Sequence, residues 1–191
     1  MLGRRFVYGG DDGSQIGSRL KELLGAIALC LQSGFPEGAL VLLYSGIDTL
    51  GLLAAAQGTN DASRKTFEGW CQLYLVPRLK SIEGQTVAPE DLWSARCGVL
   101  HTSTPVSKLS REGKAHELWY RFQGRMGVNL SVNAKLEPLG VEIEKLAVTF
   151  QEASLAFISD LGNDPIKRQN AEDRAQRFLR WCIETWHNIG Q

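Results

Sequence analysis

Residues 36–56 of this 191-residue chain read PEGALVLLYSGIDTLGLLAAA. They overlap almost completely with residues 38–57, the most apolar region of the chain. Pro36 suits the first turn of a helix, and the apolar side chains that follow cover nearly the whole circumference of that helix. The length invites comparison with a membrane span, but Asp48 falls near the centre, where a carboxylate is costly in lipid. We therefore expect a buried core helix, central in a helical bundle.

Helical spacing dominates on both sides of this segment. Ser63 is a suitable N-cap, and Pro89 opens another helix whose first turn carries Glu90 and Asp91, charges that favour a helix N-terminus. His101 is expected in the last turn of that helix. The further helices predicted from apolar periodicity span about residues 14–32, 63–75, 141–160 and 165–188.

A short β-hairpin is the exception to the helical pattern. Residues 117–123 and 128–132 alternate weakly around Gly124 and Gly127. No internal repeat and no composition shift divides the chain. We predict an all-α fold in one domain over residues 1–191, a helical bundle with a small β-hairpin insertion. Its parts are core helices within residues 14–104, the hairpin within 115–134 and two long helices within 138–189.

Composition excludes several functional classes. The 21 basic residues balance 21 acidic ones, so no overall charge attracts DNA or a membrane surface, although a local basic pocket remains possible. The N-terminus lacks the apolar stretch of a signal peptide. The cysteines show no metal-ligand spacing, so we expect reduced thiols, a cytoplasmic location and neither metal nor cofactor. They are Cys30, Cys71, Cys97 and Cys182.

Arg96 occupies a position where an apolar residue is expected. Projected at about 100° per residue from Leu92, it lies at roughly 40°, between Leu92 and Leu100 at roughly 80°. His101 lies at the edge of this apolar arc. A guanidinium on an apolar face needs partners or a cleft, because an unpaired buried charge costs several kcal/mol.

Asp48 is the matching oddity, because it is the only charged residue between Glu37 and Asp61. The simplest arrangement places Asp48 against Arg96, directly or through water, with His101 nearby. Two interpretations follow: a structural ion pair with a histidine at a helix C-terminus, or a site that carries chemistry.

Arg96 and His101 form an Arg-x4-His motif near the end of a helix, and the chain here resembles the HEPN superfamily of helical-bundle proteins. The segment LYSGIDTL at residues 43–50 is similar to the second helix of one prokaryotic branch, and so is FEGW at 67–70, ahead of Tyr74. The similarity covers roughly residues 20–104. The chain departs from the family pattern at Cys97, where active members commonly carry a polar residue.

The resemblance implies a dimeric, metal-independent endoribonuclease, or a non-catalytic relative that binds RNA or a protein. The resemblance gives His101 the acid/base role and Arg96 the role of holding the scissile phosphate. To Asp48 we assign an orienting role towards Arg96 or His101, by charge pairing. Two protomers would meet across a cleft and bring two Arg–His pairs together. A toxin or antiviral role, with a possible partner antitoxin, follows from the same resemblance.

Other candidates have simpler interpretations. His116 and His187 are expected as surface or packing histidines, and Cys97 as a core thiol rather than a nucleophile. Basic and acidic side chains are interleaved along the last helix, so we expect that they form a solvent-exposed face. Arg174, Arg177 and Arg180 nevertheless recur every three residues and are kept as a possible edge of an RNA groove. Packing and dimer-interface roles are expected for the tryptophans Trp70, Trp93, Trp119, Trp181 and Trp186.

Overall fold

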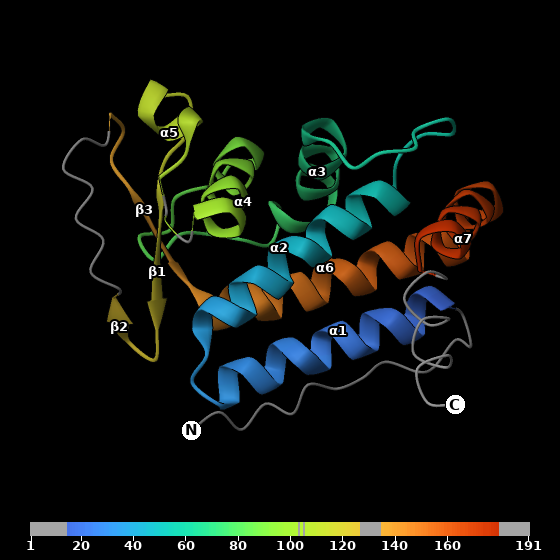
Figure 1. The fold of residues 1–191 in the computed structure, drawn as a ribbon, viewed down its shortest axis with the longest axis horizontal. Coiled ribbons are helices and arrows are strands. Elements are labelled where there is room, and N and C mark those ends of the chain that lie inside the picture. Colours follow the sequence, from blue (N-terminus) through green and yellow to red (C-terminus); the bar gives the residue numbers. More distant parts are fainter. Residues whose placement is uncertain (1–14, 103, 105, 127–134, 180–191) are drawn as a thin grey trace, which may run out of the picture.

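The computed structural model describes residues 15–102, 104, 106–126 and 135–179. Helices make up most of the described chain, and one small sheet accompanies them, as the sequence predicts. Figure 1 shows α1 (Gln15–Gln32), α2 (Pro36–Leu53) and α6 (Ile143–Asn163) lying alongside one another. The sheet lies at one end of these three helices and α7 (Pro165–Leu179) at the other.

The helix α2 is central, as its apolar circumference predicts. It contacts α1, α6 and α7, together with α3 (Arg64–Trp70) and α4 (Pro89–Thr102). Two glycines permit the closest approaches: a Cβ on Gly46 would lie 2.7 Å from both Leu23 Cδ2 and Phe150 Cζ, and a Cβ on Gly51 would lie 2.7 Å from the carbonyl oxygen of Thr66. The core includes Tyr44, Phe67, Trp70, Phe150 and Phe157, all at most 2% exposed. Among the described residues, no helix combines the length and hydropathy needed to cross a bilayer.

The helix α3 begins as predicted. The Ser63 side chain accepts a hydrogen bond from the Thr66 backbone N–H, and the Thr66 side chain accepts one from the Ser63 backbone in return, a reciprocal N-cap. Beyond Trp70 the helix widens into a π-helical turn, η1 (Cys71–Leu75). The helical segment therefore ends at Leu75 as predicted, but its last turn is π-helical rather than α-helical. The helix α2 ends at Leu53, three residues before the predicted end.

The sheet has the strand order β2-β1-β3. The strands β1 (Leu118–Phe122) and β2 (Arg125–Met126) form the expected hairpin around Gly124, which has a φ of 74°. Its predicted second strand at residues 128–132 lies outside the described residues.

A third strand, β3 (Leu139–Glu142), runs parallel to β1 and was not predicted. The prediction that a helix begins at Val141 is therefore wrong at that end, since α6 begins at Ile143. Pairing with β1, which is distant in sequence, buries Leu139 and Val141. The strand β3 has only four residues, too few for an alternating pattern that would reveal it in the sequence.

The short helix α5 (Lys108–Glu112) was also not predicted. Ser107 caps its start and Gly113 ends it with a φ of 73°. These are local signals that a search for capping residues would have found. The described part of α7 ends at Leu179, and the predicted extension to residue 188 lies outside the described residues.

Candidate functional site

An ion pair between Asp48 and Arg96 joins α2 to α4. The Nε and Nη2 atoms of Arg96 lie 2.9 and 2.8 Å from the same oxygen of Asp48, Oδ2. The two side chains are only 20% and 16% exposed. The predicted pairing is therefore confirmed, and it is direct. Partial burial strengthens such a charge-assisted contact compared with one in bulk water.

His101 lies on the other side of the same guanidinium, at the exposed C-terminal turn of α4. Its Nε2 atom is 3.3 Å from Nη1 of Arg96. An arginine can only donate hydrogen bonds, so Nε2 accepts this one and the neutral ring carries its proton on Nδ1. We assign this tautomer from the chemistry of the contact. The three residues predicted for the site are thus brought together.

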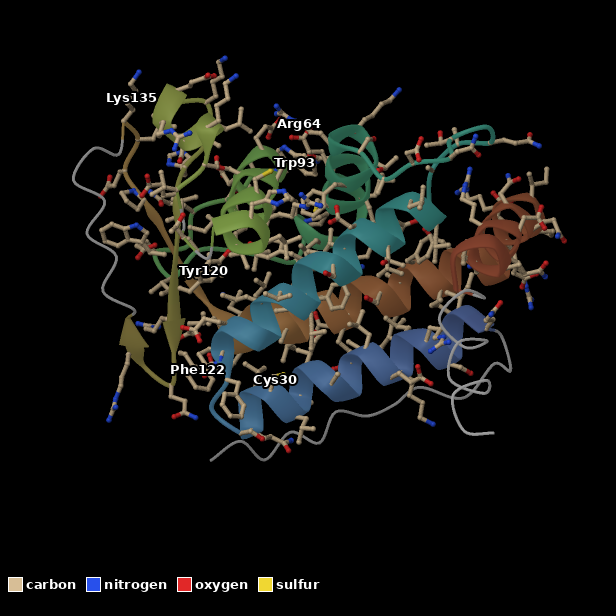
Figure 2. The ribbon with its side chains drawn as sticks, in the orientation of Figure 1. Cys30, Arg64, Trp93, Tyr120, Phe122 and Lys135 are labelled. Atoms are coloured by element: carbon tan, nitrogen blue, oxygen red, sulfur yellow. The ribbon has the colours of Figure 1, made fainter. Side chains whose placement is uncertain are left out.

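Trp93 holds the guanidinium from a third direction. The Cζ atom of Arg96 lies 5.0 Å from the centroid of the indole, a cation–π distance. The indole in turn packs edge-on against Phe67 of α3, at 5.4 Å between centroids and 67° between planes. Figure 2 shows Trp93 in the region where α3 and α4 come together. Trp93 was expected as a packing or dimer-interface residue. Its spacing three residues before Arg96 puts both side chains on one helix face but does not decide whether they meet.

The beginning of α4 is fixed by a buried aspartate. Asp91 is 2% exposed, and its two carboxylate oxygens accept hydrogen bonds from the backbone N–H groups of Ala88, at 2.9 Å, and His116, at 2.7 Å. The Ser94 and Ser107 hydroxyls, 2.6 Å apart, tie the next turn of α4 to the start of α5. The helix that carries Arg96 and His101 is therefore anchored at its N-terminal half.

The buried thiol of Cys71 lies near two carboxylates, those of Asp48 and Glu68. Burial raises the pKa of the Cys71 thiol, and the negative charges of Glu68 and Asp48 raise it further. Glu68 itself is paired with Arg64, whose Nε lies 2.6 Å from Oε1. Cys71 is thus a protonated packing residue.

Among the described residues, no side-chain hydrogen bond or ion pair links His116 or Cys97 to Asp48, Arg96 or His101. His116 directs Nδ1 at the carbonyl oxygen of Glu137, 2.7 Å away, which is a structural role. Cys97 is half-buried and not in a disulfide. His187 lies outside the described residues.

The expectation of a solvent-exposed face and the alternative of an RNA-groove edge are both wrong for Arg174. Arg174 is 7% exposed, and its guanidinium donates to the backbone carbonyls of Leu53, the last residue of α2, and of Ala56 and Thr59 beyond it. It therefore caps a helix C-terminus. The side chain of Arg177 and the whole of Arg180 lie outside the described residues.

No cluster of three or more His, Cys, Asp or Glu side chains with metal-binding geometry occurs in the described part of the chain. Comparisons of the chain with protein-family models, curated proteins and solved structures find no match.

Proposed function

We propose that the chain is a metal-independent endoribonuclease of the HEPN type that acts as a homodimer. The observation that carries the proposal is the 3.3 Å contact between Nη1 of Arg96 and Nε2 of His101 at the exposed end of α4. A permanent cation beside a neutral imidazole supplies the two groups that phosphodiester cleavage needs without a metal. The Arg-x4-His resemblance supports the same reading.

The chemistry begins at the ribose next to the scissile phosphate. The imidazole of His101 takes the proton of the 2′-hydroxyl, and the 2′-oxygen attacks phosphorus. The bond from phosphorus to the 5′-oxygen breaks, and that oxygen leaves with a proton supplied by an acid. The products are a 2′,3′-cyclic phosphate and a 5′-hydroxyl end, so no water and no redox partner is consumed.

Arg96 has donors available for the phosphate. A guanidinium carries five N–H donors. Contacts with the described residues engage one donor each on Nε, Nη2 and Nη1. A phosphate oxygen that takes the Nη1 donor also releases Nε2 of His101 and makes its lone pair available as a base. Asp48 keeps the opposite edge of the guanidinium fixed during this exchange.

In a dimer, the second protomer supplies the acid that protonates the leaving 5′-oxygen. A single imidazole cannot remove one proton and donate another in the same concerted step, whereas two-fold symmetry supplies a second histidine. Two-fold symmetry also places two Arg96 guanidinium groups in one cleft, each with an Nη1 atom that contacts His101 rather than Asp48. Uncontrolled RNA cleavage harms a cell, which is why a cytoplasmic toxin or antiviral role with a partner antitoxin belongs to the proposal.

The test is cleavage of labelled RNA by the pure full-length chain in excess EDTA. We expect products with 2′,3′-cyclic phosphate and 5′-hydroxyl ends, and no cut where the scissile ribose is replaced by 2′-deoxyribose. Sedimentation should show a dimer. Failure to cut both single-stranded and structured RNAs, or cleavage of the 2′-deoxy substrate, contradicts the proposal.

A second candidate is a non-catalytic module that binds RNA or a protein, in which Asp48, Arg96 and His101 form a structural network. The observation that favours it is the engagement of two Arg96 nitrogens by one oxygen of Asp48 in a mostly buried pair. It predicts that Arg96→Ala sharply lowers the melting temperature and that the parent cleaves no RNA. A stable Arg96→Ala dimer counts against it.

A further inference from the structure

The guanidinium of Arg96 is restrained by two neighbours that act in different directions. A single oxygen of Asp48, Oδ2, accepts a hydrogen bond from Nε and forms an ion pair with Nη2. A single partner atom works as a pivot, because both contacts survive a tilt of the guanidinium plane about it. Two carboxylate oxygens, one for each nitrogen, would resist that tilt. Asp48 therefore fixes where the guanidinium lies but leaves its tilt free.

The indole of Trp93 supplies the missing restraint. The Cζ atom of Arg96 lies over the face of this ring, 5.0 Å from its centroid. A planar cation on an aromatic face loses contact when it tilts. The position of Nη1, and with it the 3.3 Å contact with His101, thus depends on the indole as well as on Asp48.

Trp93 is itself held by a chain of aromatic side chains. Phe67 contacts the indole edge-on and stacks against Tyr44, at 6.5 Å and 25°. Phe67 and Tyr44 are both fully buried. The hydroxyl of Tyr44 shares a hydrogen bond with that of Tyr120 on β1. This chain connects the sheet, α2, α3 and α4, so the indole has a fixed platform behind it.

We propose that Trp93 is a positioning residue that sets the tilt of the Arg96 guanidinium and thereby aims Nη1 at the phosphate and at His101. Trp93 acts through Arg96 and does not itself need to touch RNA. The inference rests on the proposed function for its catalytic consequence, whereas the restraint on Arg96 is measurable in the free protein.

The first measurement is the NMR signal of the Arg96 Nε–H group, assigned by its loss in Arg96→Lys. Trp93→Leu removes the ring, so we expect this proton to lose its ring-current shift and to exchange with water faster. Trp93→Phe keeps an aromatic face and should preserve much of both properties. Trp119→Leu, which alters a half-buried tryptophan on β1, is the matched control and should change neither. An unchanged Arg96 signal in Trp93→Leu overturns the inference.

The second measurement is RNA cleavage by the same variants, with thermal unfolding to confirm that each is folded. Misplacing a catalytic group by about 1 Å costs up to about 100-fold in rate. We expect Trp93→Leu to lower kcat by about 10–100-fold with little change in KM, and Trp93→Phe to recover most of the loss. A changed NMR signal with parental kcat overturns the catalytic role of Trp93. If the parent cleaves no RNA, the proposed function fails, and the restraint then stands or falls on the Arg96 signal alone.

Discussion

One oxygen of Asp48 accepts a hydrogen bond from Nε of Arg96 and forms an ion pair with Nη2, and this contact joins the central helix α2 to the helix that carries His101. The two residues are 48 positions apart in the chain, so the contact exists only in the folded protein. Their side chains are mostly buried, and the loss of either partner leaves the other charge poorly solvated.

A double-mutant cycle measures the strength of this pair. For Asp48→Ala, Arg96→Ala and the double variant, we expect a coupling free energy of about 1–3 kcal/mol in urea unfolding, because hydrogen bonds to partly buried charges are worth about this much. The more exposed i,i+4 pair Arg168–Glu172, with side chains 53% and 33% exposed, is the control, with an expected coupling of about 0.3–0.5 kcal/mol. A coupling for Asp48 and Arg96 no larger than that of the control contradicts the structural account of the pair.

The close crossing of α2 and α3 predicts opposite effects of the same substitution at two glycines. Gly51→Ala places a Cβ 2.7 Å from a backbone oxygen of α3, so we expect a loss of about 1–3 kcal/mol in the free energy of unfolding. Gly69→Ala, on the open face of α3 with no atom within 4 Å, should gain about 0.5–1 kcal/mol from helix propensity. Thermal and urea unfolding give both values. Equal stability of the two variants argues against the described crossing.

The sequence was informative where one residue broke its own local pattern. Asp48 in an apolar helix and Arg96 in an apolar arc are such breaks, and their pairing could be predicted without coordinates. The Trp93 stack could not, because a helical projection gives the direction of a side chain but not its rotamer. The strand β3 was hidden for another reason: its pairing with β1 is non-local and spans only four residues.

The contacts of Arg174, which lies on a polar helix, could not be predicted from the sequence either. Its sequence neighbours suggest a solvated face, yet its guanidinium meets carbonyls of residues 53–59, at the far end of α2. We expect Arg174→Ala to lower the free energy of unfolding by about 1–3 kcal/mol, because the buried carbonyl of Leu53 and the two partly buried carbonyl contacts lose their donor. Arg174→Lys should recover only part of this, since an ammonium lacks the planar fork. Urea unfolding tests this, and parental stability of Arg174→Ala would be inconsistent with a capping role.

Alkaline pH should destabilise the fold through buried phenols. Burial and the hydrogen bond to Asp160 raise the pKa of Tyr74 from 10.0 to about 12, and burial also raises the pKa values of Tyr44 and Tyr120. The unfolded chain therefore loses these protons first, so the stability present below pH 10 declines as pH rises toward 12. In urea unfolding at pH 9, 10 and 11, Tyr74→Phe should show a shallower decline than the parent. Identical slopes would show that Tyr74 does not contribute.

The most direct test of the central claim compares two histidine variants in one RNA cleavage assay, with pure protein and excess EDTA. His101→Ala removes the proposed base, and we expect its rate to fall at least about 100-fold below that of the parent. His116→Ala removes a histidine with a structural contact and should cleave at nearly the parental rate. Melting temperatures confirm that both variants are folded. Cleavage by folded His101→Ala at the parental rate would contradict the claim that Arg96 and His101 form a ribonuclease site.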